Sequence, residues 1–333
     1  MAVKLGINGF GRIGRYLVRL LAEEMGIKVT VINARADNYT IAHLLKYDTA
    51  HGTFLSEVIS NYAGLIINGD QILVTRDGIG QWKWREHGID IVVETTGKIK
   101  DADGLKQHLT CGAKKVVISA PAKGVDLTVV MGVNEHIYDP DKHNVISNAS
   151  CTTNCMALAV KVLHDQFGVS RGLMTTVHSY TMSQRILDGS ANDLRRARAA
   201  AVNLIPTTTG AAKAVAEVIP ELKDRLDGMA VRVPMPNVSL VDLVIELKKD
   251  VTVESVNAAF KAAAIGLLKG NIGFSELPLV SSDYNGSSFG GVVDGLCTNV
   301  IDKRLVKLII WYDNEAGFTH QLLRLIKLIC KNL

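Results

Sequence analysis

Short apolar runs rich in β-branched residues alternate with helical or loop stretches along the first 150 residues. These runs occupy residues 3–7, 29–32, 71–75, 89–94, 116–119 and 145–147. A helix is predicted over residues 15–25, because Leu17, Leu20 and Leu21 recur on one side of it. Strands that alternate with helices are typical of a parallel sheet. We therefore predict an α/β domain over residues 1–150, built on a doubly wound parallel sheet.

The pattern changes in the second half of the chain. Longer alternating strands are predicted over residues 173–177, 229–233, 239–247 and 305–312, with helices over 156–167, 210–218 and 253–268. Such strands favour a mostly antiparallel sheet with helices on one face. We therefore predict an α+β domain over residues 151–315. The last helix, 316–333, is apolar on one side and is expected to return to the first domain.

Composition and charge narrow the class of protein. The chain has 333 residues, 47% of them hydrophobic and 21% charged, which fits a globular protein of about two domains. Its net charge of +4 and pI near 8.7 are too mild to argue for nucleic acid or a membrane as the main partner. A mild positive charge suits anionic small molecules such as phosphorylated substrates.

The cysteines and the N-terminus bear on the compartment. Five cysteines are scattered without a Cys-x-x-Cys pair, which indicates a reducing environment and argues against a structural metal site. Basic residues interrupt the N-terminal segment, so it has no apolar signal core, and no apolar run is long enough to span a bilayer. We expect a cytoplasmic protein that binds no metal.

A Gly-x-Gly-x-x-Gly pattern follows the first predicted strand and opens the first predicted helix. Gly9 would make the turn, Gly11 would let a pyrophosphate approach the backbone, and Gly14 would let helix and strand pack closely. This context predicts a Rossmann dinucleotide site. An acid for the adenosine ribose is expected after the second strand, but Ala34 and Arg35 stand there, which would admit the 2′-phosphate of NADP. Alternatively, Arg35 is a solvated surface residue.

A cysteine lies where a short apolar run gives way to a predicted helix. Ser150, Thr152 and Thr153 can cap that helix, so Cys151 would lie in or beside its first turn. A helix N-terminus favours a thiolate over a thiol and can bring the pKa of a cysteine towards neutrality. Cys151 is therefore a candidate nucleophile, and the alternative is a small buried apolar residue. For Cys155, one turn later, the structural interpretation is favoured.

Other side chains could complete a site around the thiol. His178 ends a predicted strand 27 residues after Cys151 and could stabilise a thiolate and carry its proton, or could be structural. A basic cluster over residues 195–198, together with Arg232 and the hydroxyls and backbone N–H groups of residues 207–210, could bind phosphate. The alternative for the cluster is a solvated face or a subunit contact.

Together these motifs closely resemble the phosphorylating glyceraldehyde-3-phosphate dehydrogenases, over essentially the whole chain. The stretches that carry the resemblance are residues 7–15, 44–48, 150–155, 194–200 and 311–315. The resemblance implies Cys151 as nucleophile and His178 as the base that activates it. The glycine turn and the stretch after the second strand already make Asn8, Gly9, Gly11, Gly14 and Arg35 candidate cofactor residues. To these the resemblance adds Arg12, Ile13, Arg76, Ser119 and Asn314. It assigns the substrate phosphate to Thr181, Arg196 and Arg232, and the attacking phosphate to Ser150, Thr152, Thr209 and Gly210.

The implied reaction converts D-glyceraldehyde 3-phosphate and inorganic phosphate into 1,3-bisphosphoglycerate through a cysteine thioester, with a hydride passed to NAD or NADP in glycolysis or gluconeogenesis. A homotetramer is also implied, in which the loop over residues 180–201 reaches a neighbour's cofactor site. One alternative is an erythrose-4-phosphate dehydrogenase. Another, of a different class, is a scaffold that binds nucleotide or RNA without catalysis.

Two departures from the family pattern bear on the cofactor. Ala34 and Arg35 replace an acid and its neighbour, and Gly189-Ser190 stands where NAD-specific members usually have Leu-Pro. Both changes remove features that crowd a 2′-phosphate, so we predict that NADP is accepted, alongside NAD. A third departure, Met182-Ser183-Gln184 after Thr181, has no predicted consequence.

Overall fold

The protein folds into two compact units. The structure, a computed structural model, describes residues 2–333. Unit 1 comprises residues 2–129, 135–149 and 322–333, and unit 2 comprises Val130–Asn134 and Ser150–Gln321. No helix in the described part of the chain is long and apolar enough to cross a membrane.

Unit 1 is built on a nine-stranded sheet in the order β10-β11-β9-β8-β1-β2-β7-β6-β5. Its strands are β1 (Val3–Asn8), β2 (Ile27–Asn33), β5 (Val58–Asn61), β6 (Gly64–Ile67), β7 (Asp70–Thr75), β8 (Ile91–Glu94), β9 (Lys115–Ile118), β10 (Leu127–Thr128) and β11 (Val145–Ser147). Every pairing from β10 to β7 is parallel, whereas β7, β6 and β5 pair antiparallel. The predicted doubly wound parallel sheet is confirmed, and the antiparallel β5–β6 hairpin at its edge was not predicted.

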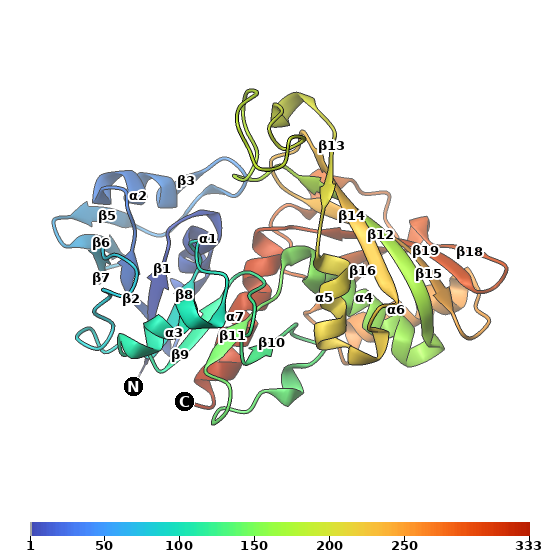
Figure 1. Ribbon diagram of the computed structural model, residues 1–333, viewed down its shortest axis with the longest axis horizontal. Helices are drawn as coiled ribbons and strands as arrows, with labels where there is room; N and C mark the ends of the chain where they lie inside the picture. Colours follow the sequence, from blue (N-terminus) through green and yellow to red (C-terminus); the bar gives the residue numbers. More distant parts are fainter. Residues whose placement is uncertain (1) are drawn as a thin grey trace. The chain divides into compact units, whose positions relative to one another are not determined.

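Three helices of unit 1 lie between its strands along the chain (Figure 1): α1 (Arg12–Leu21), α2 (Asn38–Lys46) and α3 (Ala102–Thr110). The C-terminal part of α7 (Ala316–Cys330), the last helix of the chain, also belongs to this unit. The short strands β3 (Tyr47–Asp48) and β4 (Gly52–Thr53) pair in a separate two-stranded hairpin. Helix α1 begins three residues before the predicted start, because Gly11 caps it directly after the glycine turn. It buries Leu17, Val18 and Leu21 against the sheet side of the unit, as an amphipathic helix should.

Unit 2 is built on a mixed, largely antiparallel sheet in the order β13-β14-β12-β15-β19-β17-β16, with β18 beside β19. Its strands are β12 (Val169–Ser179), β13 (Ile205–Thr208), β14 (Leu226–Val233), β15 (Ser239–Leu247), β16 (Ile272–Ser275), β17 (Gly291–Asp294), β18 (Asn299–Ile301) and β19 (Leu305–Tyr312). Only β12–β14 and β16–β17 pair in parallel among these strands of the described chain. The predicted mostly antiparallel sheet is confirmed.

Three helices of unit 2 pack against this sheet: α4 (Cys151–Phe167), α5 (Ala211–Val218) and α6 (Val253–Ile265). Helix α4 contacts β12, β15, β17 and β19, and it is buried on all sides from Thr152 to Val160. A helix without a polar face belongs in the centre of a core. Its N-terminus is consequently held rigidly, and this matters for Cys151, its first residue. Short 3-10 turns lie at Glu135–Ile137, Ala200–Val202, Pro220–Leu222, Ser281–Tyr284 and Gly295–Cys297.

Candidate functional site

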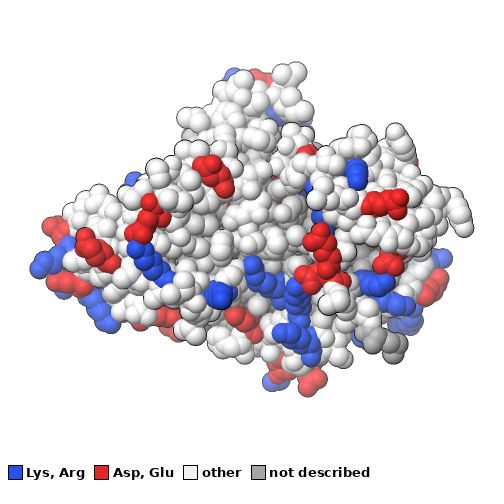
Figure 2. All heavy atoms as spheres, turned by 180° about the vertical axis from the view of Figure 1, so that it is seen from behind, with Lys and Arg blue, Asp and Glu red and all other residues white. Residues whose placement is uncertain are grey.

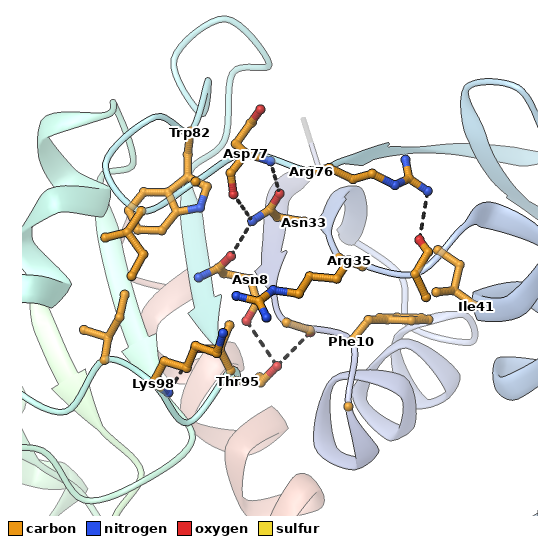
Figure 3. Close-up of a pocket in the computed structure, with 18 residues that line it drawn as sticks. Asn8, Phe10, Asn33, Arg35, Ile41, Arg76, Asp77, Trp82, Thr95 and Lys98 are labelled. Atoms are coloured by element: carbon orange, nitrogen blue, oxygen red, sulfur yellow. Dashed lines mark hydrogen bonds between the residues drawn. The ribbon is translucent and has the colours of Figure 1, made fainter.

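A cavity of about 580 Å³ opens at the carboxyl ends of β1, β2, β7 and β8 in unit 1 (Figure 3). After β1 the chain runs to β2 and β7 on one side and then returns to β8 on the other side of β1. Ligands of doubly wound sheets bind at such a reversal of strand order. The lining comes from the turns after these strands and consists of Asn8, Gly9, Phe10, Gly11, Asn33, Ala34, Arg35, Ala36, Ile41, Arg76, Asp77, Gly78, Ile79, Trp82, Thr95, Thr96, Lys98 and Ile99.

The glycine turn is shaped by close backbone contacts. Gly9 has a φ of +100°, and a Cβ there would lie 2.8 Å from the amide nitrogen of Thr96. A Cβ on Gly14 would lie 2.5 Å from the Gly9 carbonyl oxygen, whereas the space around Gly11 is open. No side-chain oxygen caps α1. Its first backbone N–H groups can therefore bind an anionic ligand, and the turn fits the pyrophosphate of a dinucleotide.

The sequence-predicted cofactor residues are divided between four places. Five line the cavity: Asn8, Gly9, Gly11, Arg35 and Arg76. Arg12, Ile13 and Gly14 lie in the first turn of α1, and Ser119 follows β9 with its amide and hydroxyl bonded to the Glu94 carbonyl. Asn314 belongs to unit 2. Sequence analysis missed Asp77 and Lys98 on the lining, although both follow strands that end at this edge.

Two arginines of the cavity differ in their bonding. Arg76 donates from Nη2 to the Ala36 carbonyl and to Asn38 Oδ1, both at 2.8 Å. Arg35 is exposed, extends into the cavity and has no hydrogen-bond or ion-pair partner among residues 2–333 (Figure 3). The buried Ala34 beside it offers no carboxylate. This corner of the cavity therefore presents an unneutralised guanidinium to a ligand.

The Arg12 guanidinium forms a two-point ion pair with Asp48, through Nη1 to Oδ2 and through Nη2 to Oδ1 at 3.0 Å. Asp48 also accepts the backbone N–H groups of Ala50 and His51. Burial opposes ionisation of Asp48, but these donors prevail and lower its pKa to about 2. The ion pair ties the start of α1 to the hairpin after α2.

Asp48 should make unfolding more sensitive to acid. Its folded pKa lies below the unfolded value of about 3.9, so its contribution is present above that value and is lost as the pH falls towards 2. We expect Asp48→Asn to cost about 1 kcal/mol at pH 7, after solvent screening, and to cost nothing near pH 2. Urea unfolding from pH 7 to 2 measures this. Asp70→Asn, which breaks an exposed pair with Lys28, is the control and should change little.

Cys151 and His178 meet in unit 2. Cys151 is the first residue of α4, whose N-cap Ser150 accepts the Thr153 N–H at 3.0 Å. His178 lies near the end of β12, with Nε2 3.6 Å from the Cys151 sulfur. Cys155 is fully buried one turn further along α4. A thiol and an imidazole at this separation can exchange a proton.

The pKa of the thiol departs from the sequence-based prediction. Burial raises the pKa of Cys151, and the charge of Arg232 and the hydroxyl and amide of Thr152 only partly oppose it. Burial first, and the adjacent Arg232 second, lower the pKa of His178 to about 3. The expected lowering of the thiol pKa by the helix N-terminus is therefore wrong for this arrangement, because desolvation outweighs the helix.

Arg232 lies against the imidazole because β12 and β14 pair in parallel, with His178 opposite Arg232 in register. Its Nη1 is 2.5 Å from His178 Nδ1 and donates to the Ser179 carbonyl at 3.0 Å. Arg196 donates from Nε to Thr207 at 2.8 Å, and its charge reaches Arg232. Two guanidinium groups beside a thiol can hold a phosphorylated substrate.

Hydroxyls and backbone amides gather where α4 and α5 begin. The Thr153 hydroxyl lies 3.4 Å from the Ala211 carbonyl, so the starts of the two helices are neighbours. Thr209 accepts the Ala211 N–H, and no side chain caps α5 at Gly210. Thr152 bonds to the buried Tyr312 hydroxyl at 2.8 Å. Tyr312 also meets the His178 ring edge-on, and sequence analysis missed this residue although it lies in the 311–315 motif.

The remaining predicted residues of unit 2 have defined neighbours. Asn314 Oδ1 accepts the hydroxyls of Ser179 and Ser239 at 2.7 and 2.9 Å, which leaves its amide NH₂ to donate elsewhere. The unusual loop residues now have a role: the Ser183 hydroxyl bonds to that of Thr181, and the side-chain oxygen Oε1 of Gln184 accepts the Thr181 N–H. They hold Thr181 in place. No cluster of potential metal ligands occurs among residues 2–333.

The fold and cavity of unit 1 define a dinucleotide-binding α/β protein. Residues 3–102 match the family model of the NAD binding domain of glyceraldehyde 3-phosphate dehydrogenase, and residues 150–314 match the model of its C-terminal domain. The glyceraldehyde-3-phosphate dehydrogenase of Geobacillus stearothermophilus is 59% identical over 326 residues, which cover 98% of this chain and 97% of the relative. Glyceraldehyde-3-phosphate dehydrogenase 1 of Bacillus subtilis is 55% identical, covering 99% of each chain. The chain belongs to the glyceraldehyde-3-phosphate dehydrogenase family, as its sequence motifs predicted.

Proposed function

We propose that this chain oxidises and phosphorylates D-glyceraldehyde 3-phosphate to 1,3-bisphosphoglycerate in glycolysis, using NAD or NADP. The observation that carries the proposal is the 3.6 Å approach of the Cys151 sulfur to His178 Nε2, beside the guanidinium of Arg232, in a member of this family. Residues 1–150 with helix 316–333 would form the cofactor domain, and residues 151–315 the catalytic domain.

The chemistry follows from the side chains. The Cys151 sulfur adds to the aldehyde carbon to give a hemithioacetal, and His178 Nε2 takes the hydroxyl proton as this adduct is oxidised to a thioester on Cys151. A bound nicotinamide would supply the hydride acceptor. Inorganic phosphate then displaces the Cys151 thiolate and leaves as the acyl phosphate.

Two groups of side chains would bind the two phosphates. Thr181, Arg196 and Arg232 suit the substrate phosphate, because guanidinium forks and a hydroxyl match its oxygens. Ser150, Thr152, Thr209 and Gly210 suit inorganic phosphate, because they surround the starts of α4 and α5. Asn314, whose oxygen is already engaged, would donate its NH₂ to the nicotinamide carboxamide.

NADH formation with D-glyceraldehyde 3-phosphate tests the function. Turnover should require added inorganic phosphate, because phosphate resolves the thioester. Efficient turnover of erythrose 4-phosphate without phosphate would instead support an erythrose-4-phosphate dehydrogenase. The scaffold alternative is less well supported, because Cys151 and His178 are both present and lie 3.6 Å apart. On the one face in Figure 2, basic and acidic side chains are interspersed. Absence of turnover with either aldehyde would overturn the proposed enzyme.

We predict that NADP is accepted because the 2′-phosphate can pair with the unpartnered Arg35 beside Ala34. Arg35→Ala should lower kcat/KM for NADP about 10- to 100-fold, which is the value of one charge-assisted contact, and should leave kcat/KM for NAD unchanged. Arg85→Ala, an exposed arginine off the cavity lining, is the matched control. A preference of the unaltered enzyme for NAD above about a hundredfold would contradict the prediction.

A homotetramer in the cytoplasm completes the proposal. The outer face of the unit 2 sheet exposes apolar side chains, among them Leu173 at 66% and Met229 at 41%. The loop between β12 and β13 stands off the sheet (Figure 1) and exposes Met182 at 91% and Leu194 at 83%. Such patches favour burial against another subunit. Light scattering measures the subunit number, and a monomer would contradict the proposed homotetramer.

The proposed cytoplasmic location has separate support. The cysteines of the described chain are all unpaired, which suits a reducing compartment.

A further inference from the structure

The Nδ1 atom of His178 has two polar neighbours with opposite demands. The Ser179 carbonyl oxygen lies 2.7 Å from Nδ1 and can only accept a hydrogen bond. Arg232 Nη1 lies 2.5 Å from Nδ1 and can only donate one. A neutral imidazole carries one proton, so only one of these neighbours can be satisfied at Nδ1.

With Arg232 in this position, Nδ1 must be the acceptor. A proton on Nδ1 would face an Arg232 N–H at 2.5 Å, which places two donors head to head. The imidazole proton therefore lies on Nε2 and points at the Cys151 sulfur. A protonated Nε2 can donate to sulfur, but it cannot take a proton from a thiol or from a hemithioacetal hydroxyl. This tautomer is the wrong one for a base.

Arg232 is poorly satisfied where it lies. Its Nε is buried without a hydrogen-bond partner in the described chain. The like charge of Arg196 acts on it as well. A phosphate would offer the Arg232 fork several oxygens and would screen the two guanidinium groups from each other. An arriving anion therefore has the differential affinity needed to move Arg232 away from Nδ1.

We propose that Arg232 is a positioning residue that sets the tautomer of His178, so that binding of the substrate phosphate converts Nε2 from a donor into the acceptor that catalysis needs. The inference rests on the proposed function, since it assumes that Arg232 binds that phosphate. A nonphosphorylated aldehyde would leave Arg232 on Nδ1 and the base disabled.

The proton count balances. When Arg232 turns to the phosphate, the Ser179 carbonyl loses the Nη1 donor at 3.0 Å and can take the Nδ1–H at 2.7 Å. The imidazole releases its proton from Nε2 to water and takes one at Nδ1, so His178 stays neutral. Its other ionisable neighbours are Cys151 from α4 and Tyr312 from β19, and neither is a cation. Of these neighbours, only Arg232 can determine which imidazole nitrogen carries the proton.

Nitrogen NMR of the full chain labelled with ¹⁵N-histidine tests the tautomer directly. His178→Asn identifies the His178 signals by their loss. We expect a pyrrole-type Nε2 and a pyridine-type Nδ1 without ligand, and the reverse pattern with glycerol 3-phosphate, which has the phosphate but no aldehyde. An identical pattern in both samples would overturn the inference, while phosphate-dependent turnover would still uphold the proposed function.

Steady-state kinetics of Arg232→Leu give a second test, in which kcat/KM should change in opposite directions for two substrates. For glyceraldehyde 3-phosphate, kcat/KM should fall about 10- to 100-fold, because the phosphate loses a charged partner. For unphosphorylated glyceraldehyde, kcat/KM should rise, because no guanidinium remains at Nδ1 to hold the imidazole proton on Nε2. A merely structural role of Arg232 would lower both values of kcat/KM. Equal losses with the two substrates would therefore refute the proposal that Arg232 sets the tautomer of His178.

Discussion

Replacing Cys151 by serine is expected to lower kcat/KM for aldehyde oxidation by about 10⁴-fold or more. A serine hydroxyl at the start of α4 is a far weaker nucleophile than sulfur, and a neutral His178 at this position is a weak base towards it. Losses of this size are typical when the nucleophile of a catalytic pair is removed. Steady-state NADH formation at saturating phosphate measures the change, and unchanged cofactor binding shows that the fold is retained.

Cys297→Ser is the matched control for this change. Cys297 is also a free thiol of unit 2, but it is exposed and lies in a 3-10 turn after β17. Its replacement should leave kcat/KM unchanged, and iodoacetamide should still inactivate that variant while Cys151→Ser has no activity left to lose. Substantial turnover by Cys151→Ser would mean that the reaction does not pass through a thioester on this residue.

The periodic elements of the fold were predictable because their signals are local. The strand, turn and helix around Gly9 follow from spacing alone, and so does the alternation of apolar residues along β15. The four-residue strands β5 and β6 carry too few alternating positions to be recognised. The parallel pairing of β12 with β14 depends on tertiary packing and cannot be predicted from the sequence of either strand.

The features of the candidate site were likewise predictable where they depend on local sequence and not where they depend on tertiary structure. Cys151 and His178 could each be singled out by residue type and context, but only tertiary structure brings them within 3.6 Å. The position of Arg232 depends on the unpredicted parallel pairing. The prediction of a lowered thiol pKa failed because it counted the helix N-terminus, a local feature, and omitted desolvation, which depends on everything packed around the sulfur.

Glu94 is a second example of a feature that the sequence does not reveal. Its carboxylate is buried at the end of β8 and accepts four hydrogen bonds. Asn8 Nδ2 donates at 2.5 Å and His108 Nε2 at 3.2 Å to Oε2, while the amide of Thr96, at 2.6 Å, and its hydroxyl donate to Oε1. The carboxylate therefore joins the turns after β1 and β8, which both line the cavity of unit 1.

Trp84 fixes the role of the histidine in this network. Its indole Nε1 donates to His108 Nδ1 at 3.0 Å, so Nδ1 is an acceptor and the imidazole proton lies on Nε2. Trp82 stacks on the same ring with centroids 3.8 Å apart. His108 was one of several histidines without apparent context in the sequence. The structure shows it as a neutral donor to the buried carboxylate.

We expect Glu94→Gln to destabilise unit 1 by about 3 kcal/mol. Whichever way the amide is turned, its NH₂ faces donors: either the Thr96 N–H, or Asn8 and the Nε2–H of His108, which Trp84 prevents from changing tautomer. Opposed buried donors lose their hydrogen bonds and remain desolvated. The melting temperature of the unit should fall by about 6–12 °C, as differential scanning calorimetry would show. Hydrogen exchange should quicken at residues 8–11 and 94–97.

Glu23→Gln makes the same chemical change on the surface of unit 1 and should shift the melting temperature by less than about 2 °C. Trp84→Phe tests the tautomer argument, because it removes the donor that fixes His108, together with part of a buried indole ring whose loss is the same with or without the change Glu94→Gln. In the double variant Glu94→Gln with Trp84→Phe, His108 can move its proton to Nδ1 and accept from the glutamine NH₂. The double variant should therefore lose less stability than the sum of the single changes, and strict additivity would refute the tautomer argument.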